Sequence, residues 1–174
     1  VPADGIVQFA HGGKITCTSG TVTILGEIRA PAQRCFVASG GTFDISSATA
    51  EQFYFEWYGI TSGGDNSTSL QWLIDQRKGW DGIAAIANYA TKIQLVQGVD
   101  YSHATALDFD NAVGLTVNGV ADGSRFQNGF TFTANSSSPA YTLKSTYGCV
   151  FNGVRFRYTH TSYSGRLIST GHSV

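Results

Sequence analysis

Two aspartates, Asp108 and Asp110, stand two positions apart in a strand-like run of the C-terminal half. Alternate residues of a strand point to the same face, so both carboxylates can approach one substrate. Paired carboxylates act as acid and base, or as acid and nucleophile, in glycoside hydrolysis. The same spacing is common on any solvent-exposed strand, and this structural interpretation is the stronger one. Asp108 and Asp110 are the catalytic candidates that the sequence offers, and the catalytic residues themselves stay unknown.

Arg155 and Arg157 are candidates for contact with an anionic sugar, because two guanidinium groups on one strand face can pair with carboxylates. Three apolar residues, Val154, Phe156 and Tyr158, alternate with them. An alternating run of this kind predicts a strand with one buried face. Both arginines are therefore predicted to point to solvent, and a structural role outweighs the sugar contact.

The segment 69–78 changes from a strand pattern to a helical one. Leu70, Leu73 and Ile74 fall at the spacing of a single helix face. Trp72 lies off this stripe, so its ring is predicted to be exposed, and it is the third candidate for carbohydrate binding. Similar spacing predicts a second short helix that contains Ile83, Ile86, Ala87 and Ala90.

The sequence indicates neither a metal site nor a cofactor. No phosphate-binding loop or dinucleotide motif occurs, and no pair of histidines has metal-ligand spacing. The cysteines are odd in number and lack a CxxC pair, which favours buried, reduced thiols. A Cys17–Cys35 disulfide stays open as the alternative. The three cysteines are Cys17, Cys35 and Cys149.

Composition and charge favour a soluble, mostly β protein. The 21 Gly and 13% aromatic residues suit short strands joined by many turns. A net charge of -1 gives no electrostatic basis for binding nucleic acid or an anionic membrane surface. No apolar run approaches the ~20 residues of a membrane span. Nucleic acid and membrane insertion are therefore not expected.

An internal repeat occupies the C-terminal part of the chain. Residues 114–120 align with residues 148–154 at an offset of 34, with Asn-Gly-Val in both copies. Repeats of about 20 to 50 residues indicate stacked structural units. We therefore expect Asn118 and Asn152 to be architectural, at turns or in a ladder of stacked side chains. The residues predicted to lie in neighbouring parallel strands are Leu115 and Val117 in one strand and Cys149 and Phe151 in the next.

Residues 53–60 read Phe-Tyr-Phe-Glu-Trp-Tyr-Gly-Ile, and Gly-Gly-Asp-Asn-Ser-Thr follows at 63–68. These motifs resemble the entry signature of the pectate-lyase-like superfamily of right-handed parallel β-helices, especially bacteriophage tailspikes of the polysaccharide depolymerase type. In that family an apolar-Pro-Glu-Trp-aromatic-Gly-Ala run leads to a Gly-Asp-Gly turn, an Asp/Asn-Thr pair and a short capping helix. Phe55 stands here for the usual Pro, and Ile60 for the usual Ala.

The resemblance implies an all-β fold, a right-handed parallel β-helix of which this chain holds the first coils. Residues 1–50 would form a small β lead-in, residues 51–90 the entry motif and short capping helices, and residues 91–174 the first coils. The chain has no methionine, even at position 1, and a strand-like pattern runs almost to its end. We therefore expect a segment of a longer protein.

Proteins of this kind are mostly virion tail components. They form homotrimers, contact other tail proteins, and bind bacterial surface polysaccharide, which many of them cleave by hydrolysis or elimination. The resemblance thus implies a tailspike segment, with the active site expected beyond residue 174. Two alternatives stay open: a secreted bacterial enzyme similar to pectate lyase or polygalacturonase, and a non-catalytic virion adhesin or structural fibre.

Overall fold

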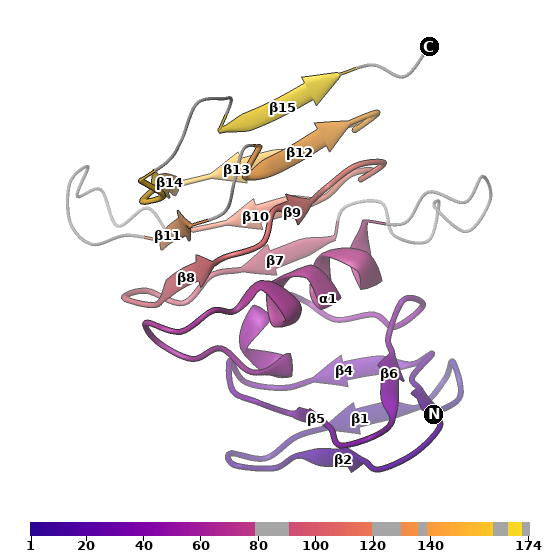
Figure 1. Cartoon of the computed structure of the whole chain (residues 1–174). Coiled ribbons are helices and arrows are strands. Elements are labelled where there is room, and N and C mark those ends of the chain that lie inside the picture. Colours follow the sequence, from indigo (N-terminus) through magenta and orange to yellow (C-terminus); the bar gives the residue numbers. More distant parts are fainter. Residues whose placement is uncertain (79–90, 120–129, 136–138, 162–166, 172–174) are drawn as a thin grey trace.

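The structure is a computed structural model that describes residues 1–78, 91–119, 130–135, 139–161 and 167–171. Two groups of short parallel strands lie one above the other, and a helix lies between them (Figure 1). The N-terminus belongs to the lower group, and the C-terminus lies at the top of the upper group (Figure 1). The helix is therefore the element that joins the two groups.

The lower group contains six strands of three residues each. Each of the first three strands pairs with the strand that comes three places later. The pairs β1–β4, β2–β5 and β3–β6 are all parallel, and the partners are separated by 21 residues, as for Thr21 and Thr42. The strands are β1 (Ile6–Gln8), β2 (Ile15–Cys17), β3 (Thr21–Thr23), β4 (Glu27–Arg29), β5 (Phe36–Ala38) and β6 (Thr42–Asp44).

Because the lower group repeats every 21 residues, turns that are 21 residues apart in the chain lie directly against each other. Gly26 lies against the carbonyl of Gly5, and Gly41 lies against Cys17 and Gly20. A Cβ atom at Gly26 or Gly41 would overlap these neighbours, so close approach of the backbones requires glycine at both positions. Gly5 and Gly26, like Gly20 and Gly41, have the same spacing as the paired strands.

The upper group contains three parallel sheets of three strands, ordered β7-β10-β13, β8-β11-β14 and β9-β12-β15. Each pass of the chain contributes one strand to each sheet. The strands are β7 (Lys92–Gln94), β8 (Asp100–His103), β9 (Leu107–Asp108), β10 (Thr116–Asn118), β11 (Phe130–Ala134), β12 (Tyr141–Lys144), β13 (Val150–Asn152), β14 (Val154–Tyr158) and β15 (Ile168–Gly171).

The strand pairing predicted from the 34-residue offset is confirmed. β10 and β13 are parallel neighbours, with Val117 opposite Phe151 and Asn118 opposite Asn152. The Asn152 side-chain amide donates to Asn118 Oδ1 at 2.9 Å, and the Asn118 amide donates to Gln94 Oε1 at 2.8 Å. The two asparagines therefore belong to a ladder of stacked amides, as the architectural interpretation predicts.

The predicted fold class, a right-handed parallel β-helix, was wrong. The described strands form six separate parallel sheets of two or three strands, and none of these sheets is closed or coiled. The physical reason is the segment between the groups: the helix and the turn before it interrupt the succession of strands. Among the described residues, the isolated bridge between the two groups pairs Phe53 with Ile93. The prediction extended a local repeat and a local motif to the whole chain.

One α-helix, α1 (Ser67–Arg77), follows the short 3-10 helix η1 (Phe55–Tyr58) in the described chain. The helix predicted at 69–78 is therefore confirmed, with its start two residues earlier. Asp65 supplies the polar group at this start, because its Oδ1 accepts from the Ser67 amide at 3.0 Å. The second predicted helix lies outside the described residues.

At the first strands of the upper group, side chains of α1 form hydrogen bonds with backbone groups that a neighbouring strand would otherwise pair with. The Gln71 amide binds both the N–H and the C=O of Asp108 in β9, at 2.8 and 3.0 Å. Ser67 Oγ accepts from the amides of Ala104 and Thr105, at 3.0 and 2.9 Å. A sheet edge exposes unpaired backbone groups, and these contacts satisfy several of them.

Arg77 makes the corresponding contacts on the lower group. Its guanidinium donates to the carbonyls of Ile45, Ser46 and Ala48 at 3.0 to 3.2 Å, and it lies 4.0 Å from the centroid of the Phe53 ring. The side chain is buried, with 3% exposure. Burial lowers its pKa to about 10, so the group keeps its charge at neutral pH.

Aromatic rings continue the core from η1 into the upper group. Phe55 lies 5.8 Å from Tyr101, which lies 5.4 Å from Phe132, and Phe132 stacks on Phe156 at 6.0 Å between centroids. Tyr101, Phe132 and Phe156 occupy one register position of β8, β11 and β14.

Cys17 and Cys35 are buried free thiols and Cys149 is a half-buried one, so the interpretation as reduced cysteines is confirmed.

We expect Arg77→Met to lower the free energy of unfolding by about 2–4 kcal/mol, because three carbonyls lose a buried charged donor while the apolar volume is kept. Urea unfolding followed by circular dichroism measures this change. Arg29→Met is the matched control, because Arg29 is exposed and contacts only Glu27 in the described structure. Equal effects of the two substitutions would contradict the role given to Arg77.

Candidate functional site

The first catalytic candidate, Asp108, is held by an ion pair and by hydrogen bonds. Its Oδ2 lies 3.0 Å from Lys78 Nζ, and its Oδ1 accepts from the Asp110 amide and the Thr142 hydroxyl. Burial alone would raise the pKa of Asp108, but the Asp110 amide and Lys78 outweigh it, and the pKa lies below its usual value. An ionised, fully engaged carboxylate of this kind is suited to fixing structure rather than to donating a proton.

Asp110 is engaged in the same way. Its Oδ1 accepts from the Lys144 amide at 2.7 Å, which ties the end of β9 to the end of β12. Lys78 also contacts Asp75 at 2.9 Å, so the ammonium group is shared between α1 and β9. The structure thus brings Asp108 close to Lys78 and Thr142, and a catalytic role of Asp108 and Asp110 stays a prediction.

Arg155 and Arg157 are exposed on the outer face of β14, while Val154, Phe156 and Tyr158 pack against the core. The predicted orientation of this strand is therefore confirmed. The residues beside the two arginines on β11 are Thr131 and Thr133. This face offers positive charge, and the contact of the two arginines with an anionic sugar stays a prediction.

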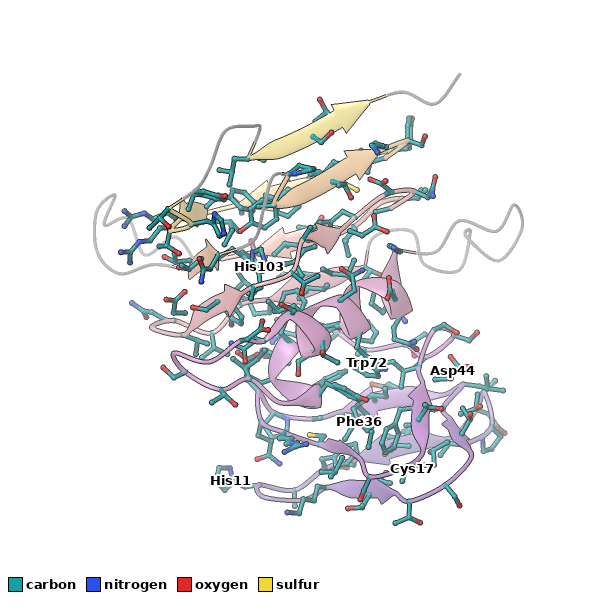
Figure 2. All side chains as sticks on the ribbon, viewed as in Figure 1. His11, Cys17, Phe36, Asp44, Trp72 and His103 are labelled. Atoms are coloured by element: carbon teal, nitrogen blue, oxygen red, sulfur yellow. The ribbon has the colours of Figure 1, made fainter. Side chains whose placement is uncertain are left out.

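Trp72 is half-buried, so its ring is only partly exposed, and its role in carbohydrate binding stays a prediction. Its ring stacks on Tyr58 at 4.3 Å between centroids with an interplanar angle of 15°, and its Nε1 donates to the Phe43 carbonyl at 3.3 Å. It points from α1 toward the lower group, where Phe36 lies 6.0 Å away (Figure 2). The spacing of Leu70, Leu73 and Ile74 predicts only one buried face of the helix. It could not predict the burial of Trp72, because a second apolar surface packs against the helix on the side of Trp72.

A polar cavity of about 410 Å³ lies where the Glu-Trp-Tyr-Gly motif meets the first turn of α1 and the start of β5. Its wall combines a guanidinium group, a carboxyl group, an amide, hydroxyl groups and one aromatic ring. Sites that bind small polar ligands are concave and place a few polar groups of this kind at fixed positions. The lining residues are Gln33, Arg34, Glu56, Tyr58, Gly59, Ile60, Thr61 and Ser69.

Glu56 is fixed by a hydrogen-bonded chain. Tyr101 Oη donates to Glu56 Oε1 at 2.7 Å and accepts from the Val96 amide at 2.7 Å. The other oxygen, Oε2, is screened from solvent and has no hydrogen-bond partner. Burial raises the pKa of this carboxyl, and the Tyr101 hydrogen bond offsets part of the effect. The protonated form of Glu56 is therefore favoured more than in an exposed glutamate.

Arg34 lies over Gly59 at the opposite wall. A Cβ atom at Gly59 would be 3.1 Å from Arg34 Nε, and Gly59 has a φ of +104°, so glycine is required here for conformation and for space. Arg34 is exposed and forms no ion pair in the described structure. The cavity wall thus includes a cationic side chain that has no ion pair among the described residues.

Sequence reasoning quoted Glu56 and Gly59 as parts of a fold motif and missed both as site residues, together with Arg34. Glu56 carries the signal that could have found it, because it is the one charged residue in an aromatic run. A carboxyl group in such a run is costly unless it has a structural or functional role. Arg34 carries no comparable signal, since only the fold brings it to Gly59.

Among the residues that the structure describes, no group of three or more His, Cys, Asp or Glu side chains could hold a metal ion. The described part of the chain also has no helix that is long and apolar enough to cross a lipid bilayer.

His103 is buried between the Thr105 carbonyl and the Tyr141 hydroxyl, both at 2.8 Å. Burial lowers the pKa of His103, which suits a neutral structural role.

Comparison of the chain with protein-family models, with curated proteins and with solved structures finds no match. The resemblance to tailspikes therefore rests on the motifs at 53–68.

We expect Asp108→Ala and Asp110→Ala to change polysaccharide cleavage by less than about tenfold in any preparation of the protein that cleaves, because both carboxylates are engaged in structure. Loss of a true acid or nucleophile costs at least ~100-fold. Initial rates of reducing-end release, measured on variants with an unchanged circular dichroism spectrum, decide the question. A collapse of turnover in either variant would place the active site at β9.

Proposed function

We propose that this protein is a segment of a bacteriophage tailspike-type attachment protein, carried on the virion, that binds bacterial surface polysaccharide. The observation that carries the proposal is the polar cavity at the Glu-Trp-Tyr-Gly motif. Its hydroxyl and guanidinium groups can form hydrogen bonds with the oxygens of a sugar. The Tyr58 ring at its wall is supported from behind by Trp72.

Binding is favoured over cleavage at this position. Glu56 is the one carboxyl group among the residues that line the cavity, whereas hydrolysis by either stereochemical route uses two. The candidates Asp108 and Asp110 are engaged elsewhere. We therefore propose that any depolymerisation, by hydrolysis or elimination, is carried out outside the described residues of this chain.

A non-catalytic virion adhesin is the second candidate, and the single carboxyl of the cavity favours it over the secreted lyase-like enzyme. Both the adhesin and the depolymerase bind polysaccharide through the same surface. They differ in whether the bound polymer shortens with time, which size-exclusion chromatography of the polysaccharide measures.

We expect Ser69→Trp to weaken binding of bacterial surface polysaccharide at least about tenfold, because the indole occupies the cavity. Biosensor measurements over a panel of purified lipopolysaccharides and capsular polysaccharides test this. Thr61→Trp, at another residue that lines the cavity, is expected to act alike. Thr16→Trp is the control, since Thr16 is exposed on β2 and lines no part of the cavity. If the parent protein binds no member of a broad panel, the proposed function is wrong.

The parent protein is proposed to be a homotrimer, as the tailspike resemblance implies, with contacts to other virion tail proteins. Low charge content is compatible with long faces buried between copies. Multi-angle light scattering of the intact protein is expected to give three times the chain mass. A monomer mass would favour the secreted enzyme.

A further inference from the structure

The polar side chains of the cavity at the Glu-Trp-Tyr-Gly motif differ in whether their hydrogen-bonding groups are already engaged by the protein. Gln33 is occupied, because its amide bonds to Ala10, Gly12 and Gly13. The hydroxyls of Tyr58, Thr61 and Ser69 line the cavity and form no hydrogen bond in the described structure. With Arg34 they make four side chains that can donate to a ligand.

The acceptor side of the cavity is weak. Glu56 Oε1 already accepts from Tyr101, and Oε2 is screened from solvent. Because burial favours the protonated form of Glu56, a negative ligand meets less repulsion from this carboxyl than from an exposed one. Arg34 is then the charged group of the wall that has no ion pair among the described residues, which favours a negatively charged ligand.

Arg34 is the group that would pair with that charge. Its guanidinium lies against Gly59, where the missing Cβ leaves the room that it occupies. A planar guanidinium recognises a carboxylate through two parallel hydrogen bonds. No carboxylate of the described chain makes an ion pair with it.

We propose that the cavity binds an acidic sugar residue, with Arg34 paired to the sugar carboxylate and with the hydroxyls of Tyr58, Thr61 and Ser69 donating to its oxygens. The inference rests on the proposed polysaccharide-binding function and names the class of sugar. It also moves the contact with an anionic sugar from Arg155 and Arg157 on β14 to Arg34 beside η1.

The test uses glucuronic and galacturonic acid, with their methyl esters as uncharged counterparts of the same shape. Nuclear magnetic resonance of the ¹⁵N-labelled chain follows the Arg34 Nε–H signal during titration. We expect the free acids to shift this signal and to bind about tenfold more tightly than the esters, since one charge-assisted pair is lost on esterification. Arg34→Gln is expected to remove this preference, and Arg157→Gln is expected to keep it.

Each outcome separates the inference from the function on which it rests. Equal affinity for acids and esters, or loss of the preference in Arg157→Gln rather than in Arg34→Gln, overturns the acidic-sugar inference while polysaccharide binding stands. Acetate binding as tightly as the uronic acids shows a simple anion site and overturns the sugar part. Polysaccharide binding in the biosensor assay with no response of Arg34 to either acid also overturns it. Absence of binding to every polysaccharide removes the proposed function itself.

Discussion

The structure depends on satisfying backbone groups at the junction between two groups of parallel strands. Short parallel strands leave unpaired N–H and C=O groups wherever their succession stops. Helix α1 supplies the missing partners through Gln71 and Ser67 on one side and Arg77 on the other. The helix is therefore held by polar contacts on two sides, and its position fixes everything built on its first turn.

The polar cavity is a consequence of that position. Ser69 lies in the first turn of α1 and Thr61 in the segment before it, whereas Arg34 lies two residues before β5 and Glu56 lies in η1. Stacking of Trp72 on Tyr58 locks the helix against η1 and leaves the polar groups of Glu56 and Gly59 at the wall. A change that shifts α1 would thus alter the cavity without touching any of the groups that line it.

The strand pairs show which parts of the fold the sequence could predict. The 34-residue offset was visible because Asn-Gly-Val recurs, and it correctly placed Val117 beside Phe151. The 21-residue offset of the lower group was missed, although Gly5 with Gly26 and Gly20 with Gly41 repeat at that spacing. Three-residue strands give too few alternating positions to reveal a repeat when the aligned side chains differ.

The sequence by itself determined the local features: helix α1, the inward face of β14, the ladder of Asn118 and Asn152, and the absence of a disulfide pattern. These follow from periodicity and side-chain type within one segment, which the fold did not override. Only the tertiary structure decided that the strands form separate small sheets, that Trp72 stacks on Tyr58, and that Asp108 is engaged by Lys78. It also decided that Arg34 meets Gly59. These facts join residues that lie far apart in the chain, and the contacts between them arise from packing that no single segment specifies.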